Sequence, residues 1–198
     1  MIREAVYAGS WYPGEPDRMN RVLDEYLAEA PVDPGKAKGV IVPHAGWLYS
    51  GHVAGATYGC VDVPATAVVL SPNHTGLGSA RSVWPVGEWK IPGGALEVNM
   101  QLADLVREKA GLESDTDAHL REHSLEIQLP FLARRRPSIS IVPVCLGQLG
   151  YKEVEKIGRG VGLAIREYGQ PVLLVASTDM SHHIPAAEAE KLDGKAIE

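Results

Sequence analysis

The chain has 198 residues and a mass of 21.3 kDa, which suits one α/β domain and is short for two. With 45% hydrophobic and 22% charged residues, its composition is that of a globular protein and excludes a disordered chain. The net charge of −6 argues against non-specific binding to nucleic acid or to an anionic membrane surface. No apolar run approaches the roughly 20 residues that span a bilayer. The N-terminus has no apolar signal core, and Cys60 and Cys145 are too few for a disulfide framework, so we expect a cytoplasmic protein.

Helical periodicity and short β-branched runs alternate along the chain. They predict, in chain order, a helix over 15–30, a strand over 39–43, a helix over 51–60, strands over 66–71 and 83–86, helices over 96–110 and 122–134, a strand over 138–147, a helix over 153–168, a strand over 171–177 and a helix after Pro185. We expect strand 39–43 to be buried on both faces, strand 83–86 to be more exposed, and Pro130 to bend or end its helix. This alternation indicates an α/β fold with a mostly parallel central sheet flanked by helices.

Three of the apolar strands run directly into segments that carry histidine. Strand 39–43 precedes His44, strand 66–71 precedes His74, and strand 171–177 precedes Asp179, His182 and His183. Because ligands of open α/β sheets bind at the carboxyl ends of the strands, we expect these histidines to converge at one edge of the sheet.

A fourth segment, EHSLEIQLP, places His123 and Glu126 three residues apart on one face of a helical turn. Two histidines with one anionic ligand and open positions form the geometry of non-haem Fe(II) sites. The alternative for each histidine is an isolated core or turn residue, and for the pair His123 and Glu126 a hydrogen-bonded helix face.

The remaining candidates keep more than one interpretation. Asp179 suits a third metal ligand, a group that orients a histidine or moves a proton, or a helix N-cap. His182 has the pKa range of a general acid or base, whereas His183 points the other way in an extended segment. His52 and His119 carry no signature, and we expect them on the surface. Trp11 suits either a pocket wall or an N-terminal aromatic plug.

Six segments carry a resemblance that spans essentially all 198 residues. They are YAGSWYPG (7–14), VPHAGWLYSG (42–51), SPNHTG (71–76), EHSLEIQLPFL (122–132), IVPVCLG (141–147) and STDMSHH (177–183). In this order they resemble the signatures of the Memo family, called AmmeMemoRadiSam system protein B in prokaryotes. The family is similar in fold to the class III extradiol (LigB-like) dioxygenases, which carry a metal pocket at the edge of an α/β sheet.

The resemblance implies roles for individual residues. His44 and His74 match the two metal-binding histidines, while Asp179, His182, His123 and Glu126 match residues that line the cleft, where a histidine of the related dioxygenases acts as acid and base. The third metal ligand of the family is a cysteine in a C-terminal CGR-like motif, and neither Cys60 nor Cys145 lies in such a motif. We therefore expect residues 1–198 to form a single Memo-like domain that lacks a C-terminal portion and the third ligand.

Two functions follow from these residues and the resemblance. The first is a mononuclear non-haem iron oxidoreductase of dioxygenase type, with copper as the alternative metal. The second is a protein without catalysis that reuses the pocket to bind a small molecule or a peptide. The family resemblance associates this second function with phosphorylated peptides in animals and with a radical-SAM partner system in prokaryotes.

Overall fold

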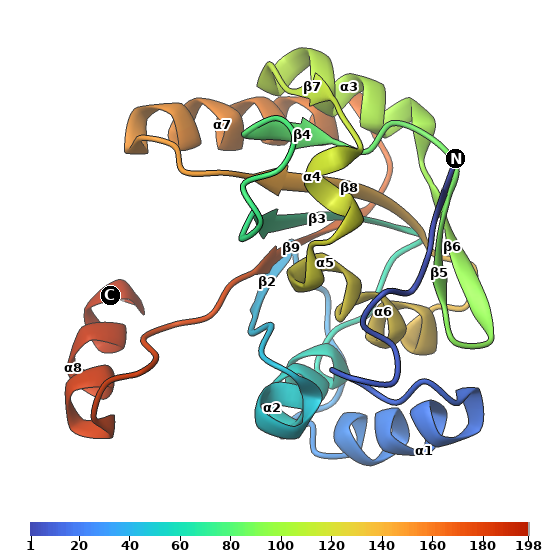
Figure 1. Cartoon of the computed structure of the whole chain (residues 1–198), viewed down its shortest axis with the longest axis vertical. Coiled ribbons are helices and arrows are strands. Elements are labelled where there is room, and N and C mark those ends of the chain that lie inside the picture. The colour runs from blue at the N-terminus through green and yellow to red at the C-terminus, as the bar shows by residue number, and fades with distance from the viewer. Residues whose placement is uncertain (198) are drawn as a thin grey trace.

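A nine-stranded sheet runs through the middle of the computed structural model, which describes residues 1–197 (Figure 1). The strands are β1 (Ile2–Arg3), β2 (Gly39–Val42), β3 (Thr66–Pro72), β4 (Arg81–Val83), β5 (Glu88–Ile91), β6 (Gly94–Val98), β7 (Glu113–Ser114), β8 (Ser140–Leu146) and β9 (Val172–Ser177). The main path has the order β1-β5-β6-β8-β3-β9-β2, and β4 joins it by pairing with β8 and β7. Only the β5–β6 and β4–β8 pairs are antiparallel among the described strands, which confirms the expected mostly parallel sheet.

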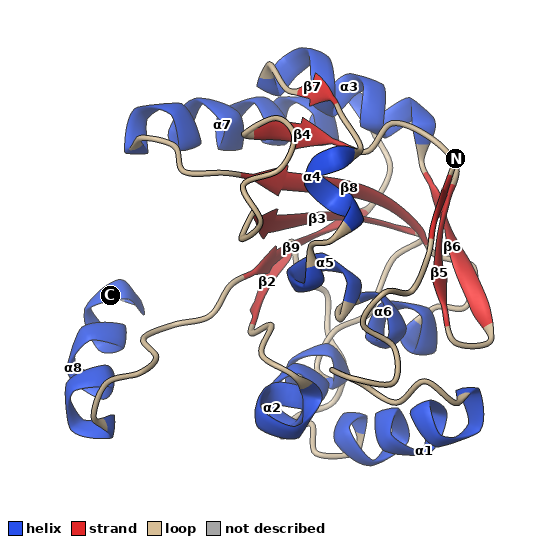
Figure 2. Cartoon of the chain, viewed as in Figure 1, coloured by secondary structure: helices blue, strands red, loops and turns tan. Residues whose placement is uncertain are grey.

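Helices cover both faces of this sheet (Figure 2). They are α1 (Pro16–Leu27), α2 (Trp47–Gly59), α3 (Met100–Ala110), α4 (Asp117–Leu120), α5 (His123–Glu126), α6 (Leu129–Arg135), α7 (Tyr151–Tyr168) and α8 (Ala186–Ile197). Helices α3 and α7 pack together on one face, and α1, α2 and α6 form a layer on the other. The α/β architecture predicted from the alternating pattern is therefore present.

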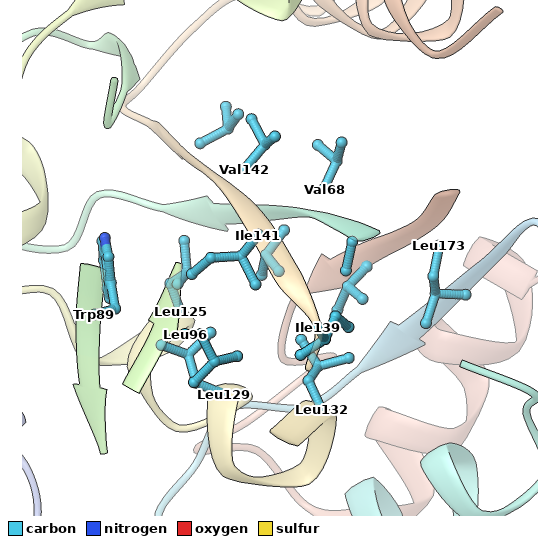
Figure 3. Packing of buried hydrophobic residues seen from close by; sticks show 14 of the residues in the cluster. Val68, Trp89, Leu96, Leu125, Leu129, Leu132, Ile139, Ile141, Val142 and Leu173 are labelled. Carbon is cyan, nitrogen blue, oxygen red and sulfur yellow. The ribbon is translucent and has the colours of Figure 1, made fainter. Parts of the chain in front are cut away.

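The core lies on both sides of the central strands. Val68 of β3 and Val142 of β8 are register partners and point toward the layer of α3 and α7, while Ile141 points toward α6 (Figure 3). All three side chains are buried completely, as are Leu129 and Leu132 of α6. This double-sided burial explains why β3 and β8 are nearly continuous apolar runs without alternation.

Strand β2 differs from its predicted environment. It pairs only with β9 among the described strands and therefore forms an edge of the sheet. Ile41 is 68% exposed, whereas Val42 is buried. The expectation of burial on both faces was wrong here, because a wholly apolar run does not reveal whether a second strand flanks it.

The segment 96–110, predicted as one helix, contains two elements. Leu96 lies in β6, which forms a hairpin with β5, and the helix begins only at Met100. The side chain of Asn99 caps this helix by accepting a hydrogen bond from the N–H of Leu102 at 3.0 Å. The apolar spacing across 96–106 runs from the buried end of β6 into α3, so it predicted one helix where the chain forms two elements. Met100, expected on the apolar side of that helix, is 56% exposed.

Two further segments correct the sequence interpretation. Segment 122–134 forms α5 and α6 rather than one helix, with Pro130 in the first turn of α6. The strand expected over 83–86 lies earlier in the chain, as β4, and shares only Val83 with the prediction. It was expected to be more exposed, but Ser82 and Val83 are fully buried. His119, expected on the surface, is 1% exposed because its ring packs against Trp84 and Trp89. Its Nε2 atom lies 2.7 Å from the hydroxyl of Ser82, which gives the buried ring a hydrogen-bond partner.

Helix α8 stands apart from the rest of the structure, at the end of the segment that leaves β9 (Figure 1). It buries none of its side chains; Leu192 is 44% exposed and Ile197 is 80% exposed. Among the helices described in residues 1–197, none is both long and apolar enough to cross a membrane.

Close packing between α1 and α2 yields a stability prediction. A Cβ atom at Gly55 would lie 2.4 Å from Cβ of Tyr26 and 2.6 Å from its carbonyl oxygen, whereas one at Gly158 in α7 would meet no atom within 4 Å. We expect Gly55→Ala to lower the free energy of unfolding by about 1–3 kcal/mol through overpacking. The matched Gly158→Ala should raise it by roughly 0.5–1 kcal/mol through helix propensity. Urea denaturation measures both, and a stabilised Gly55→Ala would contradict the close contact.

Burial of His119 yields a pH prediction. Burial lowers its pKa to about 3, below the 6.5 of an exposed histidine, so the unfolded chain takes up a proton first as the pH falls. The stabilisation is therefore complete above pH 6.5 and is lost as the pH falls, by up to about 2 kcal/mol between pH 6.5 and 5. We expect His119→Gln to reduce the slope of unfolding free energy against pH in this range. An unchanged slope in urea titrations would contradict the burial of a neutral His119.

Candidate metal centre

His44 is held at the end of β2 by groups at the end of β9. Its backbone N–H donates to Oδ1 of Asp179 at 2.7 Å, and its Nδ1 atom lies 3.1 Å from Oγ of Ser177. Since Val42 and Ser177 are register partners in the parallel ladder, the loops after both strands begin at the same level. The imidazole is almost fully buried, and its Nε2 lies 3.8 Å from Oδ2 of Asp179. The strand pairing thus positions this histidine.

His74 follows β3 in a loop that Asn73 organises. The side-chain oxygen of Asn73 accepts hydrogen bonds from the backbone N–H groups of Thr75 and Gly76, which turns the chain sharply. Both the backbone N–H and the Nδ1 atom of His74 contact the carboxylate of Glu122, at 2.7 and 2.8 Å. Glu122 therefore fixes both the backbone of the loop and the orientation of the imidazole ring.

His123 enters the same space from the first residue of α5. Its ring stacks on that of His74, with centroids 4.6 Å apart and planes 21° apart. On another side it packs against Trp11, at 4.1 Å between centroids, so the N-terminal segment forms one wall of the site. Trp11 thus lies against a site residue.

The three imidazoles of His44, His74 and His123 form a cluster of possible metal ligands. One nitrogen from each lies within 4.8 Å of the other two. Two nitrogens bound to a common ion at about 2.1 Å lie at most about 4.2 Å apart, so small side-chain rotations suffice to bring the cluster onto one ion. Imidazole is a suitable ligand for iron, copper, zinc and nickel, and the donor set therefore fits a transition metal.

Burial favours the uncharged forms of His44 and His123. It lowers the pKa of His44, and it lowers the pKa of His123 to about 4 against the opposing effect of the Glu122 charge. For Glu122, burial raises the pKa, but hydrogen bonds from His74 and Ser124 outweigh burial and bring the pKa below its usual value. The site therefore combines the neutral imidazoles of His44 and His123 with a buried carboxylate, and neutral imidazole is the form that binds a metal.

A pocket of about 790 Å³ opens over the cluster. Its walls include Trp11, Leu48 and Tyr49, with Leu48 and Tyr49 each 81% exposed at the mouth. Asp179, His182 and His183 also line this pocket. The ring of His182 is exposed and its Nδ1 contacts the carbonyl of Met180 at 3.0 Å, and His183 has a left-handed backbone with φ of 62°.

Glu126 lies outside the histidine cluster and the pocket. Its carboxylate is fully buried, forms an ion pair with Arg3, and accepts hydrogen bonds from the hydroxyl of Tyr12 at 2.8 Å and the N–H of Tyr7 at 2.9 Å. It is not among the residues that line the pocket. Of the pair expected to share the cleft, the structure brings His123 to the cluster and directs Glu126 to the N-terminal segment, which it anchors.

Sequence reasoning missed Glu122, Ser177 and Gln128. Glu122 directly precedes His123, and Ser177 is the last residue of a strand whose end was already singled out, so position alone offered a weak signal for both. Gln128 carried no signal, because its partners Pro43 and Tyr58 lie far from it in the sequence.

The chain is similar to known proteins over nearly its whole length. A family model described as "Memo-like protein" matches residues 3–198. The chain belongs to the Memo family. A MEMO1 family protein of Aquifex aeolicus is 38% identical over 193 residues, covering 97% of this chain and 72% of that protein. Those of Methanothermobacter thermautotrophicus and Sulfurisphaera tokodaii are 37% and 38% identical, each covering 100% of this chain and 76% of the relative. These matches confirm the resemblance noted in the sequence motifs.

Proposed function

We propose that this Memo-family protein is a mononuclear metal-dependent oxidoreductase of dioxygenase type, in which His44 and His74 hold iron(II), with copper as the alternative metal. The observation that carries the proposal is the approach of His44, His74 and His123 to within 4.8 Å of one another at one pocket. His123 is the third nitrogen donor that the described residues offer at this place. An iron ion bound there would supply a redox-active Lewis acid beside the pocket.

The pocket favours an uncharged, partly aromatic substrate. Trp11 and Tyr49 provide aromatic surface and Leu48 provides aliphatic surface beside the histidines. Among the described residues that line the pocket, none is lysine or arginine. Because recognition of phosphate relies on such cations, a phosphorylated peptide is a poor fit to this lining, and a catechol-like molecule is the better first probe.

Asp179 and His182 are proposed to move protons at the pocket. The Oδ1 atom of Asp179 accepts the backbone N–H of His44, and its carboxylate remains 25% exposed toward the pocket. His182 lines the same pocket with an exposed ring, which suits exchange of protons with substrate or solvent. Glu126 has a structural role rather than a part in this chemistry, since its carboxylate is bound to Arg3 and Tyr12.

The alternative proposal is a binding protein without catalysis. The exposed Leu48 and Tyr49 at the mouth favour it, because they offer apolar surface to a small molecule or a peptide segment from a partner such as a radical-SAM protein. Both proposals place the protein in the reducing cytoplasm, in which the free thiols of Cys60 and Cys145 are stable.

Metal analysis after anaerobic purification tests the proposed ligands. We expect about one iron per chain in the wild-type protein and loss of most of it in His44→Ala and His74→Ala, since each removes one of few donors. The control is His52→Ala, which removes an exposed histidine that is bound to Glu29 and does not line the pocket. Circular dichroism verifies that each variant is folded.

The outcomes separate the two proposals. Metal that depends on His44 and His74, together with oxygen uptake when a catechol is added, supports the oxidoreductase. Metal content that does not change in either variant contradicts the ligand assignment. A wild-type protein that holds neither iron nor copper, even after reconstitution, overturns the oxidoreductase proposal in favour of binding alone.

Loss of the proposed proton-transfer group has a different effect. We expect His182→Gln to lower kcat for catechol oxidation by roughly 10²- to 10⁴-fold, the usual contribution of general acid–base catalysis. Metal content should not change, because His182 is not part of the three-histidine cluster. Oxygen-electrode kinetics measure the rate, and an unaltered kcat would remove His182 from the chemistry.

A further inference from the structure

We infer that two buried acceptors, Ser177 and Glu122, hold His44 and His74 in one and the same tautomer, with the hydrogen on Nδ1 and the free lone pair on Nε2. The importance of this tautomer for metal binding rests on the proposed function, but the tautomers themselves are a property of the metal-free chain. A neutral imidazole can carry its hydrogen on either nitrogen, and the partner of one nitrogen decides which one can bind a metal.

The hydrogen bonds of Ser177 allow only one tautomer of His44. The Ser177 hydroxyl has a single hydrogen, which it donates to the carbonyl of Ser124 at 2.6 Å. Its oxygen accepts a hydrogen bond from Nε2 of Gln128 at 3.0 Å and contacts Nδ1 of His44 at 3.1 Å. Because the hydroxyl has no second hydrogen to give, Nδ1 of His44 must be the donor.

The orientation of Gln128 supports this assignment independently. Its amide nitrogen also donates to the carbonyl of Pro43 at 2.9 Å, and a carbonyl can only accept. Its amide oxygen contacts the hydroxyl of the fully buried Tyr58 at 3.1 Å. Reversing the amide would set its oxygen against the Pro43 carbonyl, so the nitrogen must face Ser177.

Glu122 dictates the tautomer of His74 in the same way. One carboxylate oxygen accepts the backbone N–H of His74 at 2.7 Å, and the other accepts the N–H of Ser124 at 3.0 Å and its hydroxyl at 2.7 Å. Since the two backbone N–H groups can only donate, each oxygen of Glu122 faces an obligatory donor, as a carboxylate requires. The Nδ1 atom of His74, 2.8 Å from this carboxylate, must donate as well.

His123 provides a comparison inside the same cluster. Its Nδ1 lies 3.4 Å from Glu122, beyond the distance of the other two contacts, and its ring is held by stacking on Trp11 and His74. The structure thus fixes the tautomers of His44 and His74 through hydrogen bonds and orients His123 through ring packing. Ser177 and Glu122 are positioning residues, since they act on a metal only through the rings that they hold.

Long-range ¹H–¹⁵N correlation spectra of the metal-free, full-length chain test the inference near pH 7.5. We expect Nδ1–H tautomers for His44 and His74, assigned by comparison with His44→Gln and His74→Gln. Ser177→Ala should release the tautomer of His44 alone, and Glu122→Gln that of His74, because a Gln amide supplies only one acceptor oxygen to the donors around it. The matched controls are Ser71→Ala, a buried serine at the end of β3 that donates to the Val144 carbonyl, and Asp115→Asn, a carboxylate that accepts backbone N–H groups outside the pocket.

A cobalt(II) titration followed by visible absorption supplies the second measurement. We expect Ser177→Ala and Glu122→Gln to weaken cobalt binding roughly 10- to 100-fold, the usual effect of removing the partner of a metal-binding histidine, while the two controls bind as the wild type does. Affinities unchanged in both positioning variants would overturn their role.

The two proposals fail in different ways. An Nε2–H tautomer at His44 or His74 in the wild-type spectra overturns the inference whether or not metal binds, and it does so even if a variant fails to fold. Nδ1–H tautomers in a wild-type chain that binds no iron, copper or cobalt leave the tautomer assignment intact and overturn the proposed metal site.

Discussion

The parallel register of β3, β9 and β2 is the constraint on which the site depends. Leu70 pairs with Ala176, and Val42 pairs with Ser177, so the three strands end nearly in step. The residues that follow each strand therefore meet at one edge of the sheet without any long excursion of the chain. A shift of one residue would turn the side chains of a strand to its opposite face and would break the contacts that hold His44 to β9.

Two buried carboxylates at the two ends of α5 tie this edge to the rest of the molecule. Glu122 joins α5 to the loop after β3, and Glu126 joins it to the N-terminal segment through Arg3. The guanidinium of Arg3 also donates to the carbonyls of Glu122 and His119 and lies 4.9 Å from the ring centre of Trp89. One short helix thus carries both the ring that enters the pocket and the anchor that keeps its wall in place.

The sequence predicted those features that depend on neighbours along the chain. The rule that ligands bind at strand ends located His44, His74 and Asp179, since it needs only the position of each strand. The sequence did not show that His123 and Glu126 lie in different places, because their spacing predicts a common helix face. In the four-residue helix α5, His123 contacts His74 and Glu126 contacts Arg3. The partner of Glu126, Arg3, is 123 residues away, and no local pattern reports such a contact.

The hairpin of β5 and β6 and the edge position of β2 escaped prediction for a related reason. Periodicity describes which side chains are apolar, but the pairing of strands decides which apolar side chains are covered. Ile41 and Val42 look alike in the sequence, yet one is largely exposed and the other buried. Conversely, the Asn99 cap, not the apolar pattern, marks where α3 begins.

The open side of β2 has a consequence for how the protein behaves in solution. An exposed strand edge can recruit another chain by continuing the sheet, and natural proteins restrain this with short edges, lysine and proline. Here the edge is only four residues long, with Lys38 before it and Pro43 after it. Pro43 lacks the N–H that would extend a ladder. Its carbonyl, directly before His44 in the chain, accepts a hydrogen bond from the amide nitrogen of Gln128. The same residue thus discourages aggregation on its outer side and supports the histidine site on its inner side.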